Sequence, residues 1–121
     1  MLYLLLFLHC SLQLPDSIFF KKLESYEDRI VIDVRPVEEY QKIHLVDALN
    51  FPSKELLTAF CDTLDRELPL FIYCKSGERS RSAMLLLKKM GFVNVWELEG
   101  GIFPIYNVID FKGYRQYFVI Y

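Results

Sequence analysis

The chain has 121 residues, enough for one domain with a single hydrophobic core and too few for two. Its composition is 53% hydrophobic and 16% aromatic, which excludes a disordered chain. The formal net charge of −2 argues against general nucleic-acid binding, which needs a basic surface. We therefore expect one compact domain over residues 1–121.

An apolar run occupies residues 2–8 and is followed by His9 and Cys10. A secretory signal carries a basic segment before its apolar run, but none of the first twenty residues is Lys or Arg. The run is also too short to span a bilayer. We expect it to form a strand or helix that is buried or covered by a partner. Export or lipid attachment through this segment is the alternative.

The chain contains three cysteines, an odd number that does not suggest a disulfide framework. Proteins without structural disulfides are typical of reducing compartments. The sequence therefore favours a cytoplasmic location.

The first half of the chain predicts one helix and two strands. The sequence Pro-Asp-Ser at 15–17 starts a helix with a stripe of aromatic and leucine side chains. Residues 29–34, RIVIDV, are rich in β-branched side chains and are followed by a proline, which predicts a short strand. A brief apolar strand at residues 49–51 is closed by another proline.

The second half continues the alternation. Ser53 caps a helix whose apolar face runs over residues 56–64. Residues 69–73 form a fully apolar strand, and residues 83–90 form a helix closed by a glycine. The last clear strand is at residues 94–98. This order of strands and helices, with strands apolar on both faces, predicts an α/β fold in which helices cover both faces of a parallel sheet.

One loop of this predicted sheet carries an unusual group of residues. Cys74 follows the apolar strand at 69–73, and ligands of parallel sheets bind just beyond such strand ends. The next helix begins near Arg79 or Ser80, so its free N–H groups point toward the loop. Gly77 permits the turn that aims these groups together. The positive potential favours the thiolate of Cys74 and makes it a candidate nucleophile.

The loop charges add to this potential, because Lys75, Arg79 and Arg81 outnumber Glu78. A lone cysteine after a strand is most often a small buried hydrophobe, and a charged loop is usually solvated. Here the cysteine, the glycine, the arginine and the helix start fall together, which favours a reactive site. Cys61 and Cys10 lack such neighbours and keep the structural interpretation.

Four motifs of the chain resemble those of the rhodanese-like domains and follow one another in the same order along the sequence. CKSGERS at 74–80 matches the active-site loop C-x-x-G-x-R-S of that family, and IDVRPVEEY at 32–40 is similar to D-V-R-x-x-x-E-[YF]. IHLVDALNFP at 43–52 resembles G-H-I-P-G-A-x-N-I-P, and LEGG at 98–101 resembles the terminal L-x-G-G. The resemblance covers about residues 16–105.

The resemblance implies a mostly parallel five-stranded sheet between helices, and transfer of a sulfane sulfur through a persulfide on Cys74. It implies no metal and no organic cofactor. The partners would be a small anionic donor such as thiosulfate and an acceptor that is cyanide, a thiol or an acceptor protein, without nucleic acid. The substrate-binding positions would be Lys75, Ser76, Gly77, Glu78, Arg79 and Ser80, with Asp33 and Arg35 as structural support for the loop.

The chain departs from the family pattern in several places. Ile43 and Asp47 replace the two glycines of the third motif, which we expect to alter a turn and not the chemistry. Ile105 stands where many members have tryptophan, and Pro104 is expected to disturb a helix there. Residues 1–14 and 106–121 have no assignment, and the aromatic side chains of the latter either complete the core or form a partner surface.

Two other functions compete with sulfur transfer. Rhodanese-like domains also serve as non-catalytic binding modules, although such modules often lack the cysteine that this chain retains. Cysteine-dependent phosphatases and arsenate reductases use a similar loop, but a phosphatase spaces its cysteine and arginine as C-x5-R. Here only four residues separate Cys74 from Arg79, which gives a loop that suits one sulfur atom better than a phosphate.

Overall fold

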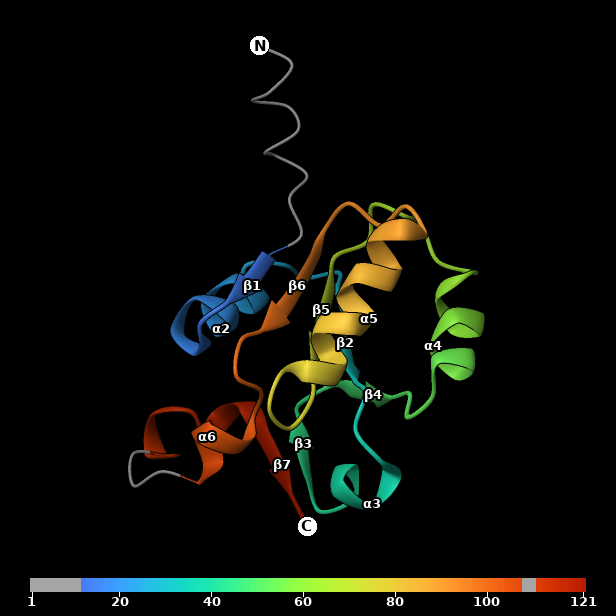
Figure 1. The fold of residues 1–121 in the computed structure, drawn as a ribbon. Coiled ribbons are helices and arrows are strands. Elements are labelled where there is room, and N and C mark those ends of the chain that lie inside the picture. Colours follow the sequence, from blue (N-terminus) through green and yellow to red (C-terminus); the bar gives the residue numbers. More distant parts are fainter. Residues whose placement is uncertain (1–11, 108–110) are drawn as a thin grey trace.

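The computed structural model describes residues 12–107 and 111–121, so the apolar run at 2–8 and Cys10 lie outside the described residues. Helices and strands alternate along most of the described chain (Figure 1). The strands are β1 (Leu12–Leu14), β2 (Ile30–Asp33), β3 (Ile43–Leu45), β4 (Ala48–Asn50), β5 (Leu70–Tyr73), β6 (Val95–Leu98) and β7 (Phe118–Ile120). The helices are α2 (Asp16–Glu24), α3 (Val37–Tyr40), α4 (Lys54–Cys61), α5 (Glu78–Lys89) and α6 (Phe103–Tyr106), with 3-10 turns η1 (Phe111–Gly113) and η2 (Arg115–Tyr117).

The main sheet has five strands in the order β1-β6-β5-β2-β4, and every neighbouring pair is parallel. β5 therefore lies at the centre, between β6 and β2. The α/β class and the five-stranded parallel sheet are confirmed. The central position of β5 explains its sequence, because a strand that is buried on both faces has no polar side to show water.

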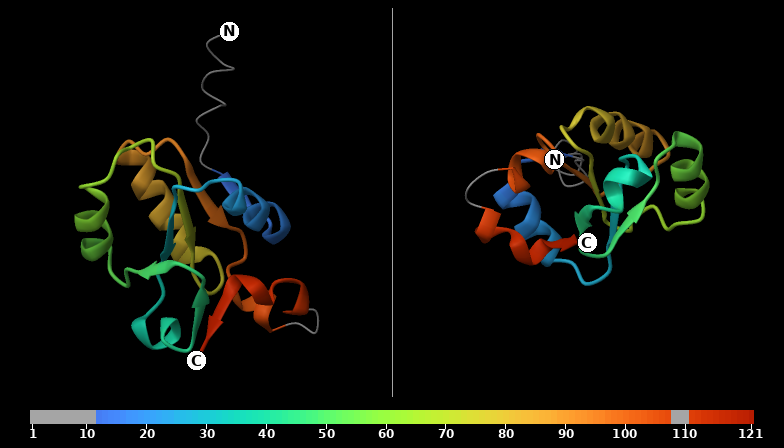
Figure 2. Two further views of the ribbon diagram at one scale, coloured as in Figure 1. Left: turned by 180° about the vertical axis from the view of Figure 1, so that it is seen from behind. Right: turned by 90° about the horizontal axis from the view of Figure 1, so that it is seen from below.

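Helices cover both faces of the sheet. α4 and α5 lie on one face, and α2 and α6 on the other, as two views of the ribbon agree (Figures 1 and 2). Each face has its own apolar cluster. One contains Leu57, Leu87 and Ile72, and the other contains Phe19, Phe71 and Trp96.

Local sequence signals set most of the element boundaries. Ser53 caps α4 by accepting a hydrogen bond from the backbone N–H of Leu56 at 3.2 Å. Gly91 has φ +100° just beyond α5, the left-handed conformation in which helices commonly end. α5 begins at Glu78, one or two residues before the predicted start, because Gly77 already serves as its N-cap residue.

The structure corrects one prediction about the C-terminal part and decides between the two alternatives left open for its aromatic residues. A helix does form at residues 103–106, and Pro104 does not disturb it because its missing N–H falls in the first helical turn, where no intrahelical bond is needed. The final aromatic side chains complete the core: Phe118 is buried, and Tyr114 and Tyr117 pack against the cluster that contains Phe20.

Short strands extend this architecture at both ends of the described chain. β1 pairs in parallel with β6 and forms an edge of the main sheet. β7 pairs antiparallel with β3 in a separate two-stranded sheet, with Leu45 opposite Phe118. The sequence did not predict β1, β3 or β7, since runs of three residues are too short for a periodic signal.

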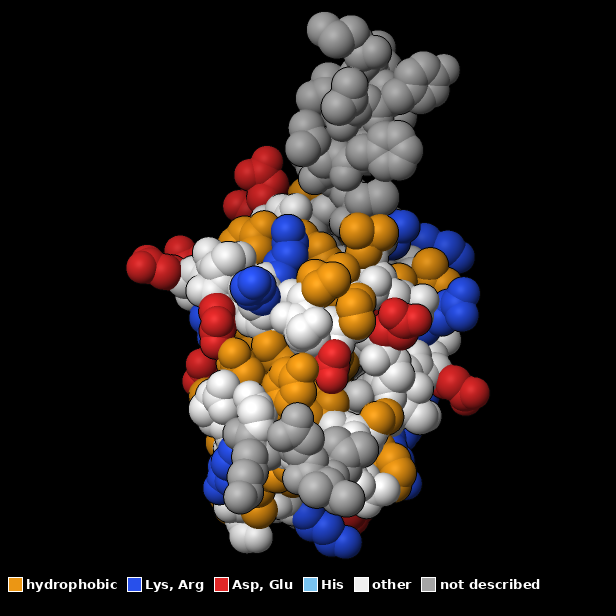
Figure 3. All heavy atoms as spheres, turned by 90° about the vertical axis from the view of Figure 1, so that its left-hand side faces the viewer, with side chains coloured by type: hydrophobic (Ala, Val, Ile, Leu, Met, Phe, Trp, Pro, Cys, Tyr) orange, Lys and Arg blue, Asp and Glu red, His pale blue; other side chains and the backbone are white. Residues whose placement is uncertain are grey.

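The face built by α2, β1 and α6 carries exposed hydrophobic side chains between charges of both signs (Figure 3). Leu12 and Ile18 are among the exposed apolar residues of these elements. In the part of the chain that the structure describes, no helix combines the length and the apolar character needed to cross a bilayer.

Candidate active site

Cys74 lies directly after β5, at the carboxyl edge of the central strand, as predicted. The backbone N–H of Gly77 donates a hydrogen bond to its Sγ at 3.0 Å. The Ser80 hydroxyl lies 3.2 Å from the same sulfur and 3.3 Å from the Gly77 carbonyl oxygen. The sulfur thus sits in a cradle formed by the turn at Gly77 and the first turn of α5.

Gly77 makes this turn possible. Its φ of +101° lies in the left-handed region that side chains with a Cβ rarely adopt. This conformation directs its N–H back toward Cys74 while its carbonyl accepts the hydrogen bond from Arg81 N of α5 at 3.1 Å. One glycine therefore connects the sulfur cradle to the start of the helix.

The loop is held from behind by the segment after β6. Ile102 N donates to the Cys74 carbonyl and Phe103 N donates to the Lys75 carbonyl, each at 3.0 Å. Gly101 has φ +72°, and a Cβ added there would lie 2.2 Å from the Lys75 carbonyl oxygen. The double glycine belongs to the LEGG motif of the sequence, but this contact with the loop was not predicted.

A buried carboxylate lies behind the cradle. Glu97 of β6 is 0% exposed, and its Oε1 accepts a 3.4 Å hydrogen bond from Gln13, while its Oε2 has no partner among the described residues. Burial raises the pKa of Glu97 to about 7, although interactions with Gln13 and Ser80 act in the opposite direction. Sequence reasoning missed Glu97, whose only signal is a charged residue within an apolar strand.

The remaining loop residues form an exposed rim. Lys75, Ser76, Glu78 and Arg79 are exposed, whereas Cys74 itself is only 1% exposed. Lys75 Nζ lies 5.1 Å from the centre of the Phe103 ring. The structure thus brings Gly77 and Ser80 to the sulfur and leaves the cationic groups where an approaching anion would meet them.

Arg79 is one of the exposed residues of this rim. Its side chain is 51% exposed, and Nη2 lies 3.9 Å from Glu39 Oε2, a long and solvated ion pair. Glu39 of α3 therefore lies beside the loop. The pair is weak enough that an incoming anion can replace Glu39 as the partner of Arg79.

Asp33 and Arg35 form a buried ion pair after β2. Arg35 Nη2 lies 2.7 Å from Asp33 Oδ2, and both side chains are at most 1% exposed. The Tyr73 hydroxyl donates to the same Asp33 oxygen at 2.6 Å, and Arg35 also donates to the Ile43 carbonyl. The pair thus supports Tyr73, the residue before Cys74, and β3. Among the described residues the pair makes no hydrogen bond to the backbone of the Cys74 loop, so support of the loop by Asp33 and Arg35 stays a prediction.

The third motif forms the neighbouring turn. His44 is buried, with Nδ1 2.9 Å from the Tyr40 carbonyl and its ring stacked on Tyr40 at a 4.0 Å centroid distance. Asp47 has φ +66°, so it adopts the conformation that the family pattern gives to a glycine. These contacts agree with a structural role for His44. Within residues 12–107 and 111–121, no three His, Cys, Asp or Glu side chains are grouped to hold a metal ion.

Comparison with known proteins identifies the family. The sequence model of the rhodanese-like domain family matches residues 19–107 of this chain. The chain belongs to the rhodanese-like domain family. Matches to solved rhodanese-like structures agree with the fold: a rhodanese-related protein from Thermoplasma volcanium has a TM-score of 0.67 at 22% identity, covering 90% of this chain and 98% of that one.

Curated relatives of this rhodanese-like chain include sulfurtransferases. GlpE of Coxiella burnetii, named a thiosulfate sulfurtransferase, is 33% identical over 84 residues, which cover 65% of this chain and 78% of GlpE. YrkF of Bacillus subtilis is 33% identical over 69% of this chain and 45% of its own length. The adenylyltransferase and sulfurtransferase UBA4 of Saccharomyces cerevisiae is 35% identical over 75% of this chain and 23% of its own length. The chain therefore spans less than half of the last two proteins.

Proposed function

We propose that this rhodanese-like chain is a sulfurtransferase that carries a sulfane sulfur as a persulfide on Cys74. The observation that carries the proposal is the convergence of the Gly77 N–H and the Ser80 hydroxyl on the Cys74 sulfur at the end of the central strand. The Gly77 N–H donates to the sulfur, and a fixed N–H donor of this kind stabilises a sulfur anion in both its thiolate and its persulfide form. The sulfurtransferase names of GlpE and UBA4 support the same class of reaction.

The first half-reaction takes sulfur from an anionic donor such as thiosulfate. The Cys74 thiolate attacks the outer sulfur of thiosulfate and forms a new S–S bond. The S–S bond of thiosulfate breaks at the same time, and sulfite leaves with the electron pair. Lys75 and Arg79 at the exposed rim attract the dianion, Arg79 through its planar fork and Lys75 as a point charge.

The second half-reaction passes the sulfur on. An acceptor thiolate or cyanide attacks the outer sulfur of the persulfide, and Cys74 leaves as a thiolate. The Gly77 N–H that donates to Sγ then stabilises the returning charge. Both steps use the same fixed donor, so the cradle needs no rearrangement between them.

Intact-protein mass spectrometry after incubation with thiosulfate tests the proposal. The wild-type chain should gain one sulfur atom and lose it when cyanide is added. Cys74→Ser should gain none, whereas Cys61→Ser should behave as wild type, because Cys61 lies at the end of α4, outside the loop. We expect the steady-state rate of sulfur transfer from thiosulfate to cyanide to fall at least about 10³-fold in Cys74→Ser and to stay at the wild-type level in Cys61→Ser.

Two results would contradict this assignment. A sulfur adduct that persists in Cys74→Ser would place the carrier on another residue. A wild-type chain that forms no adduct, despite folding normally by circular dichroism, would favour a non-catalytic binding module.

A further inference from the structure

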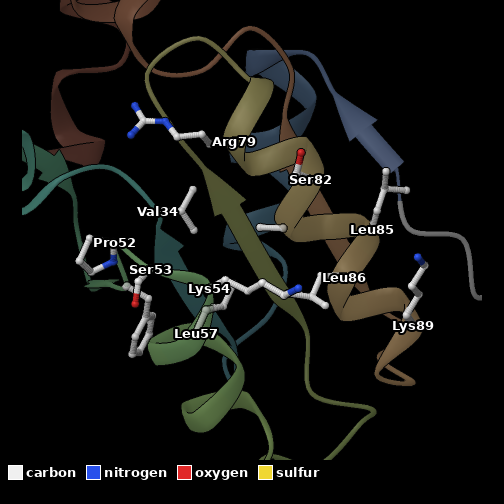
Figure 4. A pocket seen from close by; sticks show the side chains of 12 residues that line it. Val34, Pro52, Ser53, Lys54, Leu57, Arg79, Ser82, Leu85, Leu86 and Lys89 are labelled. Carbon is white, nitrogen blue, oxygen red and sulfur yellow. The ribbon is translucent and has the colours of Figure 1, made fainter.

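A groove of about 440 Å³ lies between the start of α4 and the length of α5, next to the loop that carries Cys74 (Figure 4). We call it the α4–α5 groove. Val34 and Arg79 line one part of it, and both belong to segments that adjoin Cys74: Val34 N bonds to the carbonyl of Tyr73, and Arg79 is in the loop motif itself. The groove therefore adjoins the site proposed for sulfur transfer at Val34 and Arg79.

The groove has an apolar lining. Phe51, Leu57 and Leu86 line it together with Leu85, which is 50% exposed. An exposed leucine on a helix is ordinary by itself, but here it adjoins a hollow whose volume falls within the usual range of binding pockets. This lining favours a ligand with apolar side chains.

The charged groups of the groove all have the same sign. Its charged residues are Lys54, Arg79 and Lys89, and no Asp or Glu lines it. Lys54 and Lys89 form no ion pair within the described part of the chain, and Arg79 has only its long contact with Glu39. Three cations around an apolar lining complement a ligand that carries several negative charges.

The dimensions of the groove exceed those of the small substrates. Arg79 and Lys89 are ten positions apart on α5, which corresponds to about 15 Å along a helix. Thiosulfate and cyanide need only the cradle around Cys74. An extended peptide reaches about 15 Å with four to five residues. The groove therefore fits the second, larger substrate of a transfer reaction.

We propose that the α4–α5 groove binds an extended acidic segment, with apolar side chains between its carboxylates, of a protein that accepts the sulfur from Cys74. The proposal rests on the sulfurtransferase function above and names its acceptor class. Carboxylates of the segment pair with Lys54, Arg79 and Lys89, and its apolar side chains pack on Leu85 and Leu86. This arrangement holds an acceptor thiol close to the loop.

Binding can be measured without any chemistry. The probe is a fluorescein-labelled peptide, Ser-Leu-Glu-Leu-Asp-Leu-Glu, in which serine replaces the acceptor cysteine. A second peptide carries Gln and Asn in place of the acidic residues. We expect fluorescence anisotropy to show that the acidic peptide binds the wild-type chain at least about tenfold more tightly than the neutral one.

Charge-reversal variants locate the binding. Lys54→Glu and Lys89→Glu should each weaken binding of the acidic peptide about tenfold. The matched control is Lys88→Glu, because Lys88 is the exposed neighbour of Lys89 on α5 but does not line the groove. Its affinity should stay within about twofold of wild type. Equal binding of the two peptides, or an equal loss in Lys88→Glu, would overturn the proposal.

The acceptor role is tested with cysteine at the first position of both peptides and with Cys74 loaded from thiosulfate. The acidic thiol peptide should remove the sulfur faster than the neutral one, and the ratio of its rate to the cyanide rate should fall in Lys54→Glu. Equal rates for the two peptides would overturn the acceptor role. If no persulfide forms, the proposed function fails, while the anisotropy result still decides whether the groove binds the acidic segment.

Discussion

Cys74 and Cys61 lie on the same face of the sheet and contribute to the same apolar cluster. They are buried to the same degree, at 1% and 0% exposure. Cys74 ends a strand and receives the N–H of Gly77 on its sulfur, with the Ser80 hydroxyl beside it. Cys61 ends helix α4. No described residue forms a hydrogen bond with its sulfur, although Arg66 donates to its carbonyl oxygen.

The difference shows that two equally buried cysteine sulfurs can have different hydrogen-bonding environments. Burial raises the pKa of Cys61 to about 11, and the nearby charge of Arg66 only partly opposes it. Around Cys74 the same degree of burial is accompanied by the Gly77 N–H, which donates to the sulfur, and by the Ser80 hydroxyl beside it. Cys61 has no such neighbours at its sulfur among the described residues, and burial keeps its thiol neutral.

Alkylation gives the largest expected contrast between the two cysteines. At pH 8 a thiol with a pKa of about 11 is ionised at roughly 10⁻³, so Cys61 should react with iodoacetamide at least about 100-fold more slowly than Cys74. Peptide mass mapping after timed quenching measures both rates. In urea the two cysteines should react alike, and equal rates in the folded chain would remove the distinction.

The same shift has a consequence for stability at high pH. The pKa of Cys61 is raised from 9.0 to about 11 by folding, so its contribution to stability is full below pH 9 and is lost as the pH rises through 11. Cys61→Ala lacks this titration. The difference in free energy of unfolding between wild type and Cys61→Ala should therefore shrink over this range.

The glycines behind the cradle test how rigidly it is built. Gly101→Ala places a methyl group against the Lys75 carbonyl, and we expect it to cost about 3 kcal/mol or more of unfolding free energy and to reduce persulfide formation. Gly100→Ala is the matched control, since Gly100 also has positive φ but nothing lies within 4 Å of an added Cβ. It should cost only about 1–2 kcal/mol. Urea unfolding measures both variants. If Gly101→Ala and Gly100→Ala lose the same unfolding free energy, then the contact of residue 101 with the Lys75 carbonyl does not contribute to stability.

Glu97, which lies behind the cradle, makes the free energy of unfolding depend on pH near neutrality. Because its folded pKa is raised from 4.5 to about 7, stability is full below pH 4.5 and is lost as the pH rises through 7, by about 3 kcal/mol in total. Glu97→Gln lacks this titration. Its free energy of unfolding relative to wild type should therefore rise by about 3 kcal/mol between pH 4 and pH 8. Urea unfolding at both pH values measures it.

A difference in unfolding free energy between Glu97→Gln and wild type that stays constant from pH 4 to pH 8 would contradict this prediction. It would mean that folding does not raise the pKa of the buried Glu97 carboxylate.

The smallest expected effect concerns the donor. Arg79→Ala removes the charged hydrogen bond that we propose for thiosulfate. Such a bond contributes about 1.5–3 kcal/mol, so we expect kcat/KM to fall roughly ten- to a hundred-fold. Lys75→Ala should follow the same trend more weakly. Lys88→Ala, exposed near the other end of the same helix, should leave kcat/KM near wild type. An equal loss for thiosulfate and for a neutral organic polysulfide would make Arg79 a scaffold of the loop.

Local features of the sequence determined much of this molecule. The apolar run at 70–73, the cap at Ser53 and the glycine at 91 each act within one element, and they predicted the central strand and its neighbouring helices. The loop motif placed Cys74 at the carboxyl end of β5 for the same reason. These signals depend on helix and strand periodicity and on turn conformation, which a few consecutive residues define.

The tertiary structure alone decided which distant segments surround that loop. Gly101 packs against Lys75, and Glu97 lies behind Ser80, because β6 pairs beside β5 in the sheet. The final aromatic residues join the core through the pairing of β7 with β3. Such contacts depend on strand order and on packing between elements far apart in sequence. No local pattern encodes them, so they become visible only when the whole chain is folded.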